Sequence, residues 1–170
     1  IRIDHFRGFA GYYAIPYGDA TARNGKWYSA PGKELFKTIN ETFKDAKIIA
    51  EDLGWETPEV QSLIEKTGFP NMKILQFAFD SDISDPFLPR NFGNNCVCYT
   101  GTHDNDTTLG WYNTASRKEK ILFECLTSDI PETSPVFKLI YYGMKSKAER
   151  VIVPFQDYLE LDTRHRLNSP

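Results

Sequence analysis

The sequence has few cysteines, no excess of charge of either sign and no long apolar run. Its 170 residues include three cysteines, 20 lysines and arginines, and 23 aspartates and glutamates, for a net charge of −3. This charge balance gives no sign of the positive patch through which nucleic acids and anionic membrane surfaces are bound. No apolar run approaches the length of about 20 residues that a membrane-spanning helix needs. We therefore expect neither a nucleic acid nor a membrane as a partner.

The odd number of cysteines leaves at least one thiol outside any disulfide pairing. Disulfides are rare in reducing compartments, so a cytoplasmic location is the simpler inference, or a plastid stroma if the source is a plant. Cys96 and Cys98 lie in an apolar, strand-like run, which favours buried thiols over metal ligands.

Histidine is scarce as well, since the chain has only His5, His103 and His165. A zinc site needs several His or Cys ligands at fixed spacing, and this spacing does not provide them. The Gly-rich loop that dinucleotide-binding sheets usually carry is also missing. We expect neither a metal nor an organic cofactor.

What the sequence does contain is an alternation of strand-like and helix-like segments. Helices are predicted from about residue 32 to 45, after Thr57-Pro58, after the capping box at Ser116, and from Ser134-Pro135. Residues 5–31 look like a long polar and aromatic loop. Short apolar runs predict strands at residues 1–4, 47–50, 72–77, 96–100 and 151–153. This βαβ pattern predicts a parallel sheet with helices packed against it.

Acidic or amide side chains follow nearly every predicted strand. They are Asp4, Glu51, Asp80, Asp104, Gln156 and Asp157. An α/β barrel assembles its active site at this edge from several strands, so we predict an α/β fold of the TIM-barrel type. A complete barrel needs eight strands and about 250 residues. We therefore expect this chain to be the later part of a longer protein.

Asp4 and Glu51 suit glycoside chemistry, which needs one ionised and one protonated carboxyl group. Arg2 beside Asp4 would favour the carboxylate of a nucleophile. Glu51 follows an apolar strand and adjoins Asp52, which favours the protonated form of a general acid. Taken singly, however, each acid could instead cap a helix or join a salt bridge.

Residues 101–107 (GTHDNDT) allow two interpretations. Asp104, ionised beside His103, could hold sugar hydroxyls. Alternatively, Asp104 or Asp106 could cap the helix predicted through Leu109 and Trp111.

Three stretches resemble the catalytic signatures of the amylomaltase family, the bacterial 4-α-glucanotransferases and plant disproportionating enzymes of glycoside hydrolase family 77. They are residues 2–8 (RIDHFRG), 50–54 (AEDLG) and 101–107 (GTHDNDT). Further stretches agree in the family's order, so that the resemblance covers essentially the whole chain. They are residues 24–27 (NGKW), 30–32 (APG), 75–80 (LQFAFD), 86–89 (PFLP) and 166–168 (RLN).

The resemblance implies a role for each of three carboxylates. Asp4 would be the nucleophile, Glu51 the general acid/base, and Asp104 the group that stabilises the oxocarbenium-like transition state. The positions that match the family's substrate contacts are Arg2, His5, His103 and Asn168. The resemblance also implies a TIM barrel. Residues 1–170 would be its C-terminal part, roughly strands four to eight, with the upstream strands and inserted subdomains absent.

The implied activity is the transfer of α-1,4-glucan segments to a glucan or glucose acceptor by retaining double displacement. Retention requires two carboxyl groups about 5–5.5 Å apart. The expected partners are maltooligosaccharides and starch-derived glucans, and the oligomeric state stays open. Two alternatives remain: an α-amylase-type retaining hydrolase, and a glucan-binding fragment without activity. We expect the isolated chain to be inactive.

Overall fold

A computed structural model describes residues 1–54, 57–166 and 168. The chain divides into two compact units, Ile1–Met72 and Lys73–Pro170, called the first and the second unit below. Among the described residues, no helix has both the length and the apolar character to cross a membrane.

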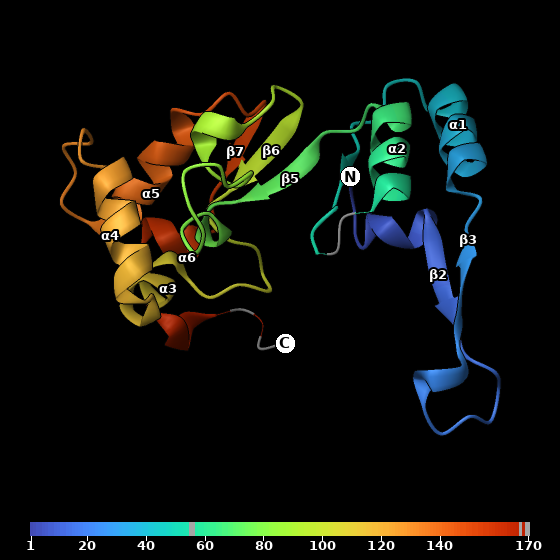
Figure 1. Ribbon diagram of the computed structural model, residues 1–170. Coiled ribbons are helices and arrows are strands. Elements are labelled where there is room, and N and C mark those ends of the chain that lie inside the picture. Colours follow the sequence, from blue (N-terminus) through green and yellow to red (C-terminus); the bar gives the residue numbers. More distant parts are fainter. Residues whose placement is uncertain (55–56, 167, 169–170) are drawn as a thin grey trace. The chain divides into compact units, whose positions relative to one another are not determined.

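The first unit contains a short parallel sheet and two helices that lie side by side (Figure 1). In the sheet, Arg2 lies opposite Ile49 and Ile3 opposite Ala50. The elements are β1 (Arg2–Ile3), η1 (Phe6–Phe9), β2 (Gly11–Ala14), η2 (Ala22–Asn24), β3 (Lys26–Ser29), α1 (Gly32–Thr42), β4 (Ile49–Ala50) and α2 (Pro58–Thr67). As predicted, α2 follows Thr57 and has proline as its first residue, where a missing N–H costs nothing.

The segment predicted as a loop between residues 5 and 31 contains an antiparallel hairpin, so that prediction is wrong for β2 and β3 (Figure 1). Tyr12 lies opposite Tyr28, with ring centroids 5.7 Å apart, and Tyr13 lies opposite Trp27 at 5.4 Å. Facing aromatic pairs stabilise two-stranded sheets. The hairpin thus depends on cross-strand contacts, which a search for apolar alternation does not detect.

A cluster of buried phenylalanines and aliphatic side chains forms the core of the first unit. The Phe6 and Phe36 rings stack with their centroids 4.9 Å apart. At the start of α1, a Cβ on Gly32 would lie 2.1 Å from the carbonyl oxygen of Phe9, so no larger residue fits there. The buried members are Phe6, Phe36, Ile48, Ala50, Leu63 and Phe69.

The second unit is built around a three-stranded sheet of order β5-β6-β7, in which β6 and β7 are parallel (Figure 1). The predicted strand over residues 72–77 ends early, because its last three residues form η3. The elements are β5 (Asn71–Ile74), η3 (Leu75–Phe77), η4 (Pro89–Asn91), β6 (Cys96–Tyr99), α3 (Thr108–Thr114), α4 (Arg117–Leu126), α5 (Pro135–Met144), β7 (Arg150–Ile152), α6 (Phe155–Tyr158) and η5 (Thr163–His165).

All five predicted strands therefore contain β structure, and the fold is mixed α/β as expected. In the described part of the chain they belong to separate small sheets and do not close a barrel.

The start of α4 matches the prediction. Ser116 and Glu119 form the expected capping box, with the Ser116 N–H donating to Glu119 Oε2 at 2.7 Å and the Glu119 N–H to Ser116 Oγ at 3.2 Å. The sequence has an apolar run after this cap, but Ile121 and Cys125 within it are exposed. Instead Phe123 is fully buried, because its ring packs against other aromatic side chains of the core.

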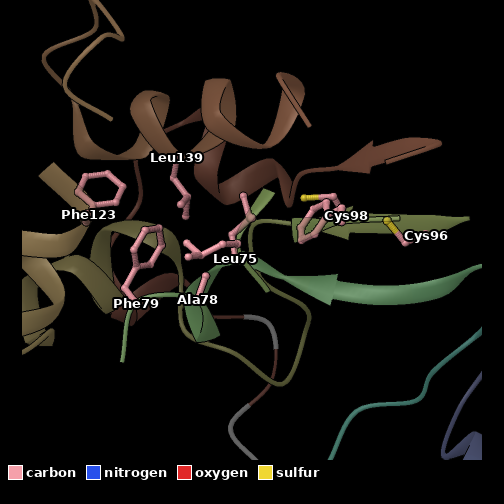
Figure 2. Close-up of a cluster of buried hydrophobic side chains, with 9 residues drawn as sticks. Leu75, Ala78, Phe79, Cys96, Cys98, Phe123 and Leu139 are labelled. Carbon is pink, nitrogen blue, oxygen red and sulfur yellow. The ribbon is translucent and has the colours of Figure 1, made fainter. Parts of the chain in front are cut away.

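Figure 2 shows the core of the second unit, where side chains from η3, β6, α4 and α5 point toward one another. Phe79 lies at its centre, with its ring centroid 5.3 Å from Phe123 and 5.5 Å from Trp111. The other buried members are Leu75, Ala78, Leu88, Phe92, Cys96, Cys98 and Leu139.

The expected burial of Cys96 and Cys98 is confirmed, and Cys125 is exposed. Burial, with a smaller contribution from Cys96, raises the pKa of the Cys98 thiol to about 12. Because the thiolate is the reactive form, we expect a thiol reagent at about pH 8 to modify Cys125 but not Cys98 in the folded protein.

Mass spectrometry of the labelled protein checks this expectation, and Cys125→Ser should abolish the fast labelling. Label on Cys98 without denaturant would contradict it.

Candidate active site

Asp4 and Glu51 come together because they directly follow two paired strands. The parallel register of β1 and β4 places the next residue of each strand at the same edge. The Glu51 N–H donates to the carbonyl of Ile3 at 2.9 Å, and the Phe6 N–H donates to the carbonyl of Glu51 at 2.8 Å. The backbone therefore holds the two acids on adjacent segments of the chain.

Asp4 forms the predicted pair with Arg2, since Arg2 Nη2 lies 2.7 Å from Asp4 Oδ1. The Arg2 guanidinium is itself positioned by a contact of its Nε with the sulfur of Met72 at 3.3 Å. The Asp4 side chain is 72% exposed, so a ligand can reach its carboxylate. This combination of a cationic neighbour and an open face suits a nucleophilic carboxylate.

Glu51 is held quite differently from Asp4. It is 9% exposed, and each of its carboxyl oxygens accepts a backbone N–H. His5 N donates to Oε2 at 2.6 Å and Leu53 N donates to Oε1 at 2.9 Å. These two bonds hold the carboxyl plane in one orientation. A fixed orientation suits a group that delivers a proton along one direction.

His5 adopts a left-handed backbone conformation, with φ 48° and ψ 51°. A non-glycine residue in this region stores strain that persists only where the surroundings enforce it, and such residues cluster at functional sites. In this conformation the N–H of His5, the residue after Asp4, points at the carboxyl group of Glu51. The ring lies over Gly8, where an added Cβ would be 3.1 Å from His5 Cδ2.

Asp104 lies in the second unit, in the loop between β6 and α3. Its Oδ1 accepts from Asn168 Nδ2 at 3.1 Å, and its Oδ2 lies 3.3 Å from His103 Nε2. Both Asp104 and His103 are about half exposed, at 52% and 54%. The structure thus joins three residues that the sequence predicted for the site, and it leaves their polar ends accessible.

A recess of about 250 Å³ opens beside His103. Phe155, Gln156 and Arg166 contribute to its walls, and Arg166 Nη2 also donates to the carbonyl of Asp104 at 3.2 Å. An aromatic face together with polar side chains is typical of a sugar-binding surface. Leu167, which belongs to the matching stretch 166–168, lies outside the described residues.

The alternative interpretation of Asp104 as a helix cap is wrong. The N-cap of α3 is Thr107, whose Oγ1 accepts from the N–H of Gly110 at 3.1 Å. Asp106 is bound in a different way, because it accepts from the Thr107 N–H at 2.7 Å and from Thr163 Oγ1 at 2.8 Å. The carboxylate of Asp104 therefore has no role in starting the helix.

Asp157, another of the predicted strand-end acids, does not face an open site. It is 1% exposed and is surrounded by the hydroxyls of Thr100 and Thr108. The sequence also did not predict that the Leu53 N–H binds Glu51 or that Arg166 contacts Asp104. A backbone donor leaves no trace in residue type, and the Arg166 contact requires a tertiary turn that brings residues 62 positions apart together.

Across residues 1–54, 57–166 and 168, no group of three or more His, Cys, Asp or Glu side chains is placed to hold a metal ion.

The sequence model of the 4-alpha-glucanotransferase family, glycoside hydrolase family 77, matches residues 1–170. The chain belongs to this family. It is 47% identical to the 4-alpha-glucanotransferase of Thermus thermophilus, matching over 100% of the chain and 35% of that protein. It is 45% identical to the chloroplastic/amyloplastic 4-alpha-glucanotransferase of Solanum tuberosum, over 99% of the chain and 29% of that protein. The chain thus spans about a third of the length of these glucanotransferases.

Solved structures of the glucanotransferase family agree with this assignment. The amylomaltase from Streptococcus agalactiae, solved in complex with acarbose, superposes with a TM-score of 0.91 and 36% identity, over 99% of this chain and 34% of that one. The amylomaltase from Corynebacterium glutamicum shares the fold, with a TM-score of 0.69 and 16% identity. The expected membership in the amylomaltase family is confirmed.

Proposed function

We propose that this chain carries the catalytic carboxylates of a 4-α-glucanotransferase that acts by retaining double displacement. The observation that carries the proposal is the pairing of β1 with β4, which brings an open Asp4 and an oriented Glu51 to one edge within the family's signature stretches. Membership in the 4-alpha-glucanotransferase family supports the choice of reaction.

In the first step, Asp4 attacks the anomeric carbon of an α-1,4-glucan and the glycosidic C–O bond breaks. Glu51 donates its proton to the departing oxygen, so the reducing-end segment leaves as an alcohol and a covalent glycosyl-enzyme remains. In the second step, the Glu51 carboxylate takes the proton from the 4-hydroxyl of an acceptor glucan. The acceptor oxygen then displaces Asp4, and two inversions give overall retention.

Asp104 and the hydroxyl-binding residues act on the sugar without forming a covalent bond to it. Asp104 stabilises the oxocarbenium-like transition state, and its hydrogen bond from Asn168 holds one carboxylate oxygen in place. We assign contacts with sugar hydroxyls to Arg2, His5, His103 and Asn168, as the resemblance to the family implies. No metal or organic cofactor takes part in this proposal.

We further propose that residues 1–170 form the C-terminal part of a TIM barrel, roughly strands four to eight, within a longer polypeptide. The superposition on about a third of the Streptococcus agalactiae amylomaltase supports this view. That amylomaltase was solved with acarbose, which supports α-glucans as the substrates here. We place the enzyme in the cytoplasm, or in a plastid if the source is a plant.

Incubation of the longer polypeptide with maltotriose tests the proposed reaction. Transfer predicts glucose together with oligomers longer than the substrate. Only shorter sugars would contradict transfer and favour the α-amylase-type hydrolase, which uses the same acids with water as the acceptor. The 170-residue chain alone is expected to give neither product pattern, because most of the groove that holds a glucan would be missing.

A further inference from the structure

The buried carboxylate of Asp157 accepts hydrogen bonds on both of its oxygens. Asp157 lies on α6 and is 1% exposed. Its Oδ2 accepts from Thr100 Oγ1 at 2.6 Å and from Thr108 Oγ1 at 2.7 Å, while its Oδ1 accepts from Thr108 N at 2.8 Å. An unpaired charge is costly to bury, so a carboxylate in this position requires such a set of donors.

The two threonines mark the ends of the loop that carries Asp104. Thr100 directly follows β6, and Thr108 is the first residue of α3. By binding both, one carboxylate connects the beginning and the end of residues 101–107 and also the first turn of the following helix. The N–H of Thr108 belongs to the donors that a helix leaves without an internal partner, so this bond also stabilises the start of α3.

Within the loop, further hydrogen bonds reduce its freedom. Asn105 Oδ1 accepts from Thr102 N at 2.8 Å and from Thr102 Oγ1 at 2.9 Å. Gln76 Nε2 donates to the carbonyl of Asp106 at 2.9 Å. With its ends joined through Asp157 and its middle held by these bonds, the loop presents the half-exposed Asp104 in one orientation.

We propose that Asp157 is a positioning residue for catalysis, which sets the orientation of Asp104 through Thr100 and Thr108. It does not touch substrate, since its side chain is enclosed by the protein. This inference rests on the proposed function, because it assigns Asp104 a role in the transition state. The position of Asp104 matters because a displacement of about 1 Å at a reacting centre can lower the rate by about 10²-fold.

The test uses the longer enzyme and matched pairs of variants. Asp157→Asn keeps the shape but removes the charge, and its NH₂ group can only donate, so the Thr108 N–H and the two threonine hydroxyls no longer share two accepting oxygens. Thr108→Val removes one hydroxyl at nearly constant volume, and Thr108→Ser restores it. We expect kcat for disproportionation to fall by about 10²-fold in Asp157→Asn. A smaller fall is expected in Thr108→Val, little change in Thr108→Ser, and in all three KM should change far less than kcat.

A double-mutant cycle with Asp104→Asn separates positioning from general stability. If Asp157 acts through Asp104, Asp157→Asn should cause little further loss of kcat once Asp104 has been replaced, because contacting residues of one network are not additive. If Asp157 only stabilises the fold, the same fractional loss appears in both backgrounds and follows the unfolded fraction. That result, or wild-type kcat in both Asp157→Asn and Thr108→Val, would overturn the inference. Should Asp157→Asn not fold, the Thr108→Val and Thr108→Ser pair decides the question in the same cycle.

Amide hydrogen exchange of residues 102–106 tests the loop independently of any assay of activity. Faster exchange in Thr108→Val than in Thr108→Ser supports the connection through Asp157, and equal exchange in the two contradicts it. If the wild-type enzyme transfers no glucan, or if Asp104→Asn retains full activity, the proposed function fails while the exchange result still stands. If the wild-type enzyme transfers glucan and Asp104→Asn loses activity, but the Asp157 and Thr108 variants keep the wild-type rate, the positioning role alone fails.

Discussion

Changing Glu51 to glutamine in the longer enzyme should lower the rate of glucan transfer by about 10²–10⁴-fold, the usual contribution of a general acid/base. Glutamine cannot give a proton to the leaving oxygen or take one from the acceptor. The substitution also disturbs the site itself, because one of the two N–H donors, His5 N or Leu53 N, would then face the amide NH₂ instead of a carboxyl oxygen. Initial rates with maltotriose measure the effect.

An activated donor separates the roles of Glu51 and Asp4. A maltosyl fluoride releases fluoride, which needs no proton, so Glu51→Gln should form the glycosyl-enzyme from it and then accumulate this intermediate. Asp4→Asn should fail with maltotriose and with the fluoride alike, because no nucleophile remains. Mass spectrometry of the trapped adduct should place it on Asp4.

Glu41→Gln is the matched control for Glu51→Gln. Glu41 lies on α1 with a side chain that is 67% exposed, and its contact with Lys37 is long, at 3.9 Å. Activity should therefore stay at the wild-type level. Wild-type rates in Glu51→Gln, or equal inactivation of both glutamine variants, would contradict the role given to Glu51.

Changing Phe79 to alanine should lower the free energy of unfolding by about 3–5 kcal/mol, as expected for a fully buried phenylalanine. Phe79 is 0% exposed, and its ring contacts those of Trp111 and Phe123. The loss would combine the transfer free energy of the ring with the cost of the cavity left between η3, α3 and α4. No small shift of one helix can close a gap that three elements line.

Urea denaturation followed by tryptophan fluorescence measures this effect, because Trp111 lies next to the cavity. Phe43→Ala provides the control, since Phe43 is 63% exposed at the end of α1 and its loss should change stability by less than about 0.5 kcal/mol. Similar destabilisation in both variants would mean that Phe79 is not a centre of the core.

Local signals in the sequence predicted the elements that local interactions form. The capping box at Ser116 and the Thr57-Pro58 start of α2 are examples, because caps depend on residues within one turn of each other. The apolar runs likewise predicted where β1, β4, β5, β6 and β7 lie. The hairpin of β2 and β3 was not predicted, because Tyr12 and Tyr28 stabilise each other across 16 residues and neither strand has a clear apolar alternation.

The candidate site shows the same division. Asp4, Glu51 and Asp104 could be predicted from their places after strands and from the signatures around them. The role of Asp157 could not, because its position after β7 looks like that of the other strand-end acids. Its burial depends on which helix covers it, and residue type does not report that.

By itself, the sequence determined the family, the positions of β1, β4, β5, β6 and β7 along the chain, and the identity of the three acids proposed for catalysis. These features depend on residue type and short spacing, so they can be predicted without knowing any tertiary contact. Only the tertiary structure decided which acid is open and which is enclosed. It exposes Asp4 beside Arg2, fastens Glu51 to two backbone N–H groups, and buries Asp157 beneath the loop of Asp104. The physical reason is that the environment of a carboxyl group comes from donors that are distant in the chain and adjacent in the fold.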